Sequence, residues 1–207
     1  LDNKQSILLH LGMSGKINII NPMNKKIRSS FYYDLTKNLD KHNHLIFEFK
    51  NNYKLVYNDV RKFGFLKVIK TNKLLQNKHL KILGPEPLSK NFNFKYFKSK
   101  IKGKKQTIKD CLMSQKFVSG LGNIYVNEVL FFSKVNPFTK SEKLTDKQIV
   151  NIIINTKIIL KKAIKKGGSS IMNFKDAEGN LGKFQDFFRV YGKNNKLCSN
   201  LKCKGVI

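Results

Sequence analysis

The chain has 207 residues, with 41 Lys or Arg against 13 Asp or Glu, which gives a formal net charge of +28 at pH 7. A hydrophobic fraction of 41% is typical of a folded protein, and the sequence has no run of about 18 apolar residues that could cross a bilayer. These numbers exclude a disordered or membrane-spanning chain. The charge favours a polyanionic partner such as nucleic acid.

The first third of the chain predicts β structure. Short apolar or alternating runs predict strands within residues 6–11, 16–20, 44–57 and 63–70. The pair Asn51-Asn52 interrupts the third run and predicts a hairpin turn there. Residues 25–41 are polar and irregular, so we expect a loop between the second and third runs.

After Gly84-Pro85-Glu86-Pro87 the apolar spacing becomes helical. Apolar residues spaced three and four apart predict four helices, within residues 92–101, 107–115, 123–133 and 146–166. Thr145 and Gln148 predict a capping box at the start of the last helix, and Gly167 predicts its end. A β domain is therefore followed by a helical domain, with a hinge near residues 70–90.

The C-terminal part contains a glycine-rich stretch and two of the three cysteines. The stretch at 167–189 predicts a mobile loop region, and Cys198 and Cys203 follow it on a predicted hairpin. Cys111 lies in an apolar helical stretch and is expected in the core. Three scattered cysteines are too few for a disulfide framework, so a reducing cytoplasm is expected.

Two motifs in the β region suggest exposed side chains that enter a duplex. Met13 lies in HLGMSG, on a glycine-flanked turn, where a Met filling a core gap is the alternative. Arg61 and Phe63 are two residues apart and point the same way if the chain is extended, which suits a wedge with a hydrogen-bonding fork. The alternative is an ion pair of Asp59 with Arg61 beside a core Phe. Only three of the 41 basic residues are Arg, which singles out Arg61 for a role that Lys cannot fill.

Three further segments suggest anion or metal contacts. The turn before Asn123 opens a helix whose N–H groups suit a phosphate, with an ordinary helical hairpin as the alternative. Lys104, just before a predicted helix, is placed to contact a phosphate without reading sequence. Cys198 and Cys203 form either half of a structural zinc site, which needs four ligands, or a chance pair of thiols.

Six collinear motifs carry a family resemblance: HLGMSG, KHNH, DVRKFG, LGPEPL, QKFVSGLGNIYVNEVLF and VYGKNNKLCSNLKC. In this order they closely resemble the bacterial formamidopyrimidine-DNA glycosylase family, from residue 7 to the last residue. The resemblance implies an α+β fold. We expect the C-terminal part of an N-terminal β-sandwich at 1–75, a helical helix–two-turn–helix (H2TH) domain at 76–190, and a truncated zinc-finger hairpin at 191–207.

The resemblance also implies roles for particular residues. Met13 would fill the space left by an everted nucleotide, Arg61 would bond the widowed cytosine, and Phe63 would wedge beside it. The predicted DNA-binding residues are His42, Arg61, Lys104 and Asn123. The loop at about 171–187 would cover the flipped base.

The family's chemistry is base-excision repair. Its members remove oxidised purines, namely 8-oxoguanine and formamidopyrimidines, and nick the abasic site by β,δ-elimination through an amine nucleophile. The proline, glutamate and lysine that do this lie before HLGMSG in the family, so we expect this chain to be a fragment that contains no catalytic residue. The implied cofactor is one structural Zn²⁺, with Cys198 and Cys203 as ligands.

The implied partner is double-stranded DNA with an oxidised purine or an abasic site, bound by a monomer in the bacterial cytoplasm and not at a membrane. Two other functions stay open at this point. One is a catalytically dead relative that binds duplex DNA without the nucleophile. The other is a basic RNA-binding protein whose charge reflects the Lys-rich composition of an AT-rich genome.

Overall fold

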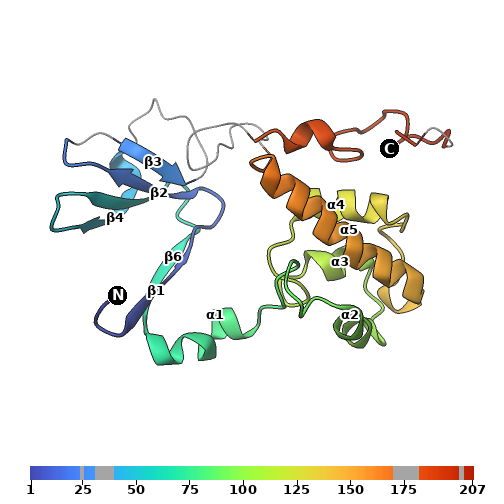
Figure 1. Ribbon diagram of the computed structural model, residues 1–207, viewed down its shortest axis with the longest axis horizontal. Helices are drawn as coiled ribbons and strands as arrows, with labels where there is room; N and C mark the ends of the chain where they lie inside the picture. Colours follow the sequence, from blue (N-terminus) through green and yellow to red (C-terminus); the bar gives the residue numbers. More distant parts are fainter. Residues whose placement is uncertain (24–25, 31–39, 170–181, 201–202) are drawn as a thin grey trace. The chain divides into compact units, whose positions relative to one another are not determined.

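The structure is a computed structural model that describes all residues except 24–25, 31–39, 170–181 and 201–202 (Figure 1). Strands come first and helices follow, in agreement with the predicted α+β class. The chain forms two compact units: Leu1–Gln76 with Lys166–Gln185, and Asn77–Lys165 with Asp186–Ile207. The three segments predicted from the sequence, at 1–75, 76–190 and 191–207, stay a prediction.

The first unit contains six described strands in two antiparallel sheets. The strands are β1 Gln5–His10, β2 Gly15–Ile20, β3 Lys26–Ser30, β4 Asn43–Glu48, β5 Lys54–Asp59 and β6 Phe65–Lys70. β1 pairs with β6, and the other four follow the order β3-β2-β5-β4 (Figure 1). One 3-10 turn, η1 Asp40–His42, directly precedes β4, and another, η2 Thr71–Gln76, follows β6. β2 and β5 are the two inner strands of the larger sheet, and the second half of β5, Val56 to Asp59, is buried.

The strand β3 corrects one prediction, because residues 25–41 were expected to form a loop. Lys26–Ser30 instead pairs with β2, with Ser30 opposite Ile17 and Arg28 opposite Ile19. An edge strand is held by backbone hydrogen bonds to a single neighbour, so its sequence does not need apolar alternation. Residues 31–39 of the predicted loop lie outside the described part of the chain.

The hairpin between β4 and β5 turns where the sequence predicted it. Asn52 has φ of +62°, a left-handed conformation that Asn tolerates. The N–H of Asn52 donates to the carbonyl of Phe49 at 2.9 Å, and the N–H of Phe49 donates to the carbonyl of Tyr53 at the same distance. The turn at Asn51-Asn52 is therefore confirmed.

The second unit is helical. Its helices are α1 Lys78–Lys81, α2 Phe94–Ile101, α3 Ile108–Met113, α4 Asn123–Phe132 and α5 Asp146–Lys165, with the 3-10 turn η3 Ser141–Lys143. Another 3-10 turn, η4 Phe184–Phe187, spans the boundary between the units. The predicted capping box of α5 is present: the N–H of Thr145 donates to Gln148 Oε1 at 2.9 Å, and the N–H of Gln148 donates to Thr145 Oγ1 at 3.3 Å. Gly167, with φ of +71°, follows the end of α5 as predicted.

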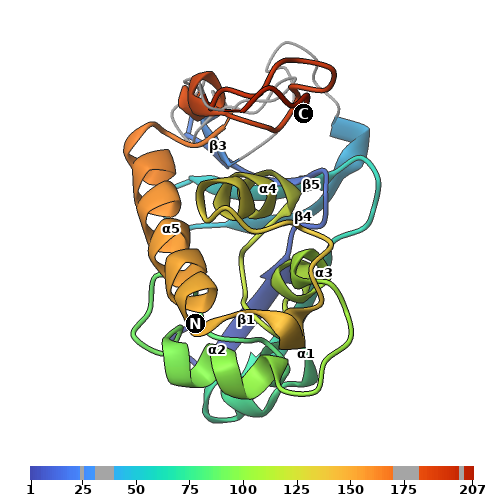
Figure 2. The same ribbon diagram turned by 90° about the vertical axis from the view of Figure 1, so that its right-hand side faces the viewer.

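Helix α4 packs against α5, α2 packs against α5, and α3 packs against α4 (Figure 2). The core that they enclose consists of fully buried side chains from every helix of the group: Phe92, Phe97, Ile108, Leu112, Leu121, Val126, Leu130, Ile149 and Ile152. Cys111 is fully buried, which confirms its predicted place in the core. Within the described residues, no helix has the length and apolar character needed to cross a membrane.

Candidate nucleic-acid interface

Met13 lies at the tip of a tight turn between β1 and β2. Gly12 has φ of +64°, and a Cβ added there would lie 2.8 Å from the backbone carbon of Phe63, so only glycine fits this close approach. The N–H of Gly15 donates to the carbonyl of Leu11 at 2.9 Å and closes the turn. Met13 is 65% exposed, so it does not fill a gap in the core.

Asp59, at the end of β5, is a fully buried carboxylate that organises this region. Its Oδ1 accepts the hydroxyl of Ser14 at 2.5 Å and the backbone N–H of Arg61 at 3.3 Å. Its Oδ2 accepts the N–H of Gly64 at 2.8 Å and the hydroxyl of Tyr57 at 3.1 Å. One side chain therefore holds both the turn that carries Met13 and the segment that carries Arg61 and Phe63.

Burial by itself raises the pKa of a carboxyl, but the four hydrogen bonds to Asp59 stabilise the charged form and lower its pKa to about 2. The pKa of Tyr57 moves the other way, to about 12. Burial is the main cause, and the negative charge of Asp59 and the hydrogen bond to it add to the effect. The pair is thus an ionised acceptor with a neutral donor across the whole neutral pH range.

We call Asp59 and the four groups that it binds the Asp59 hub. The side chains of Arg61 and Phe63 next to this hub are exposed, and the exposed fraction of Phe63 is 58%. The guanidinium carbon of Arg61 lies 4.4 Å from the centre of the Phe63 ring, and its Nη1 lies 3.6 Å from the sulfur of Met13. The structure thus brings the three predicted side chains together, and we call them the Met13–Arg61–Phe63 cluster. The alternative of an ion pair beside a core Phe is wrong, because Asp59 binds the backbone of Arg61 and Phe63 is exposed.

The two histidines of the KHNH motif, His42 and His44, lie in different elements and have different surroundings. His42 is half-buried at the end of η1, and its predicted contact with DNA stays a prediction. His44 is the residue that the sequence reasoning passed over: its Nε2 lies 2.8 Å from the backbone carbonyl oxygen of Asp59. His44 therefore supports the hub from the neighbouring strand, β4.

The turn between α3 and α4 is held by the side chain of Gln115. Its Oε1 accepts the N–H of Gly120 at 2.7 Å, and its Nε2 donates to the carbonyl of Leu121 at 2.9 Å. Gly120 has φ of +82°, which favours glycine. Close packing also fixes Gly84, where a Cβ would lie 2.5 Å from the backbone of Phe117.

Helix α4 begins directly after this turn, with Gly122 as its N-cap and no side-chain hydrogen bond to cap it. An uncapped helix start attracts an anion such as phosphate, because its N–H groups and dipole both favour negative charge. Asn123 is exposed there, and its Oδ1 accepts the side-chain amide of Asn127 at 3.2 Å. Lys104 is also exposed, and its carbonyl accepts the hydroxyl of Ser141 at 3.0 Å, which holds its backbone in place.

The two C-terminal cysteines lie on a hairpin, as predicted. The N–H of Cys198 donates to the carbonyl of Gly205 at 2.9 Å, while the thiols of Cys198 and Cys203 are free. Among the described residues, no group of three or more His, Cys, Asp or Glu side chains is placed to hold a metal ion. Two thiols do not by themselves make the four-ligand shell of a structural zinc site.

The loop predicted to cover a flipped base, about 171–187, lies mostly outside the described residues. Its described end contains η4, where Gln185 Nε2 donates to the carbonyl of Gly182 at 2.6 Å. Lys162 of α5 places its ammonium 4.1 Å from the centre of the Phe187 ring. This contact ties the end of η4 to α5.

Comparison with known proteins connects both units to one family. The profile of the formamidopyrimidine-DNA glycosylase N-terminal domain matches residues 1–66, and that of the formamidopyrimidine-DNA glycosylase H2TH domain matches residues 83–175. The formamidopyrimidine-DNA glycosylase of Dinoroseobacter shibae is 36% identical over 207 residues, which are all of this chain and 72% of that protein. The protein of the same name from a Ruegeria species is 35% identical over 208 residues, 71% of its length.

Solved structures agree. A complex between the Lactococcus lactis Fpg and DNA containing an abasic site matches with a TM-score of 0.77 and 36% identity, over 95% of this chain and 67% of that one. A complex of a mutant of the same protein with Fapy-dG-containing DNA matches with a TM-score of 0.78 over the same shares of the two chains.

Proposed function

This chain belongs to the formamidopyrimidine-DNA glycosylase family. We therefore propose that the protein acts as a base-excision repair DNA glycosylase and AP lyase. The proposed enzyme removes oxidised purines, 8-oxoguanine and formamidopyrimidines, from duplex DNA and nicks the abasic site by β,δ-elimination. We further propose that it acts as a monomer in the bacterial cytoplasm. The solved relatives bound to abasic-site and Fapy-dG DNA support duplex DNA as the partner.

The observation that carries this proposal is the Met13–Arg61–Phe63 cluster. Two large apolar side chains and a guanidinium are exposed together, although exposing Met and Phe to water is unfavourable. A base stack offers such a cluster both an apolar surface and hydrogen-bonding edges. We assign Met13 to the space left by the flipped base, Phe63 to the wedge beside it, and Arg61 to the base opposite.

The sequence-independent grip is assigned to three other residues. Asn123 at the uncapped start of α4 and the exposed Lys104 are suited to phosphates, which position a duplex without reading it. His42 is assigned to the same backbone contacts on the strength of the family motif. The net charge of +28 supports binding that is strong at low salt.

The cleavage step needs an amine that attacks the sugar and forms a Schiff base, and we assign no residue of this chain to that role. What the chain contributes is the extrusion of the base and the hold on the bent duplex. Cys198 and Cys203 are our candidates for two ligands of a structural zinc ion, and no step is derived through zinc.

The test is binding and trapping on matched duplexes. The chain should bind a duplex with 8-oxoguanine opposite cytosine, or a tetrahydrofuran abasic analogue, more tightly than the undamaged duplex. Equal affinity for both would refute the proposed recognition. Because no residue of this chain is assigned as the amine, borohydride trapping is applied to the protein as its gene encodes it, where a covalent adduct supports the glycosylase. Binding without an adduct there would support the alternative of a catalytically dead relative, and preference for single-stranded RNA would contradict both.

A further inference from the structure

Glu128 is a buried carboxylate in the second unit that the proposed function does not use. It lies in the second turn of α4 and is 1% exposed, among the buried apolar residues Val126, Val129 and Leu130. Burying an ionised carboxylate is unfavourable unless other groups replace the hydrogen bonds of water. The partners of Glu128 therefore indicate why it is there.

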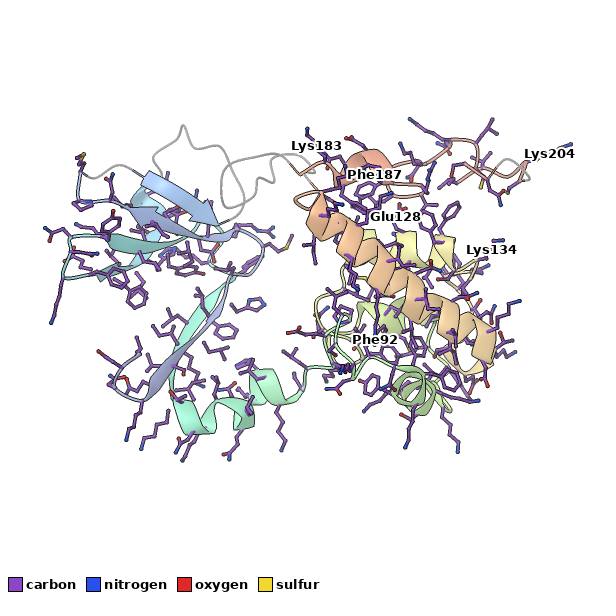
Figure 3. All side chains as sticks on the ribbon, viewed as in Figure 1. Phe92, Glu128, Lys134, Lys183, Phe187 and Lys204 are labelled. Atoms are coloured by element: carbon purple, nitrogen blue, oxygen red, sulfur yellow. The ribbon has the colours of Figure 1, made fainter. Side chains whose placement is uncertain are left out.

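These partners are three consecutive backbone N–H groups more than sixty residues away in the chain. Oε2 accepts the N–H of Arg189 at 2.9 Å, and Oε1 accepts those of Val190 at 3.0 Å and Tyr191 at 2.9 Å. Figure 3 shows Glu128 below the segment that carries Phe187. Successive N–H groups that converge on one point form a site for an anion, and here the anion belongs to α4 itself.

The segment held in this way leads directly into the C-terminal hairpin, residues 195–207. The hairpin is closed by backbone bonds between its two ends, from the N–H of Asn195 to the carbonyl of Ile207 and from the N–H of Ile207 to the carbonyl of Lys196, both at 3.0 Å. The described residues of the hairpin form no helix. Its position on the second unit is therefore determined by what holds the residues before it.

Close packing does not hold the hairpin against α4 along its whole length. A cavity of about 870 Å³ separates them, lined on the hairpin side by Cys198, Asn200 and Cys203 and on the other side by Leu130 and Phe131. Across a space of this size, side chains lose the close contacts that fix one element on another. The carboxylate of Glu128 binds the residues just before the hairpin and so ties the start of this segment to α4.

We propose that Glu128 is a positioning residue that couples the start of α4 to the C-terminal hairpin, so that a phosphate gripped at Asn123 and one met by the exposed Lys196 and Lys204 of the hairpin keep a fixed spacing. The inference rests on the proposed DNA-binding function and adds to it the part of the chain that sets this spacing. Glu128 comes five residues after Asn123 in the same helix, so the link between them is stiff.

The charge of Glu128 is needed for this role. A carboxylate offers two acceptor oxygens to three donors, whereas the amide of Gln offers one oxygen and would turn an NH₂ group toward an N–H. We call the three hydrogen bonds from residues 189–191 to Glu128 the clamp. Glu128→Gln keeps the volume of the side chain and removes the clamp. Glu142→Gln, at an exposed position in η3, removes the same charge and is the matched control.

The experiment measures amide hydrogen exchange and DNA affinity on the full chain. In the unmodified protein the amides of 189–191 should exchange about tenfold or more slowly than that of the adjacent, exposed Gly192, a comparison that needs no variant. Glu128→Gln should abolish this difference, leave the amides of α5 unchanged, and weaken binding to a tetrahydrofuran duplex severalfold relative to Glu142→Gln.

Each result decides one part of the proposal. Unprotected amides at 189–191 in the unmodified protein would overturn the clamp, as would unchanged exchange in Glu128→Gln. Faster exchange with the duplex affinity of Glu142→Gln would overturn the coupling to DNA. An unmodified protein that does not prefer the tetrahydrofuran duplex would refute the proposed function instead, while the exchange data would still decide the clamp.

Discussion

The Met13–Arg61–Phe63 cluster and the proposed phosphate-binding start of α4 both lie on glycine-containing connections between elements, but the two connections expose different groups. The cluster exposes side chains and is held by Asp59, a buried charge with four hydrogen bonds. The turn before α4 exposes backbone N–H groups and is held by Gln115, an exposed neutral amide that makes two hydrogen bonds. In the proposed function, the first distinguishes bases and the second contacts only phosphates.

This contrast predicts how sensitive each region is to substitution. A buried carboxylate cannot be replaced by water, so removing it leaves donors unsatisfied in the interior. An exposed amide can be replaced in part by solvent. The cluster should therefore be the more fragile region and the turn the more tolerant one.

The largest expected effect tests this contrast through stability. Asp59→Ala should lower the free energy of unfolding by about 3 kcal/mol or more, because several buried donors lose their acceptor. Urea unfolding measures it. Asp146→Ala, which removes an exposed carboxylate paired with Lys98, is the control and should cost about 1 kcal/mol or less. Equal losses in both variants would contradict the role of Asp59 as the hub.

The pH dependence of stability should show the same hub. The pKa of Asp59 is lowered from 3.8 to about 2, so its contribution is complete above its unfolded pKa and is lost as the pH falls through the folded value. The loss should reach about 2 kcal/mol. Carbonyl NMR titration of Asp59 together with unfolding at about pH 5 and about pH 2 checks both. A titration midpoint near 3.8 would contradict the prediction.

Recognition of the base opposite the lesion should depend on Arg61. Arg61→Ala should reduce the preference for cytosine opposite an abasic site by about 1–3 kcal/mol, the value of one bidentate contact. Affinities for duplexes with each of the four opposing bases measure it. Lys62→Ala removes the same charge from the next residue and should weaken all four duplexes alike. An unmodified protein that binds all four equally would exclude this role of Arg61.

Gln115→Ala should affect the turn before α4 more mildly. The loss of its two hydrogen bonds should weaken binding by about 1 kcal/mol, and equally for damaged and undamaged duplexes, because the turn serves only the phosphate grip. Gln76→Ala, at the exposed end of η2, is the control. A loss confined to damaged duplexes would show that the turn reads the lesion.

The smallest effect is expected at Lys104. Lys104→Ala should lower the affinity for every duplex and reduce the slope of log affinity against log salt concentration by about 1. Lys147→Ala, at the exposed first turn of α5, removes the same charge from another surface and should leave the slope unchanged. Equal slopes in the unmodified protein and Lys104→Ala would remove Lys104 from the interface.

Much of the fold was predictable because it is encoded locally. The capping pair Thr145 and Gln148, the end of α5 at Gly167 and the turn at Asn51-Asn52 depend on neighbouring residues only. The strand β3 was missed because an edge strand is held by its partner's backbone, which leaves no apolar period in its own sequence.

For the site, the motifs of the sequence already mark Met13, Arg61 and Phe63, and the order of these motifs also indicates the family. How these side chains are held depends on the tertiary structure. An ion pair with Arg61 was the alternative for Asp59, and instead its oxygens bind the hydroxyls of Ser14 and Tyr57 and two backbone N–H groups of the segment after β5. Glu128 carried no signal within its helix, because its partners lie more than sixty residues away. The residue types were visible in the sequence, but which donors meet a buried carboxylate depends on chain segments that only folding brings together.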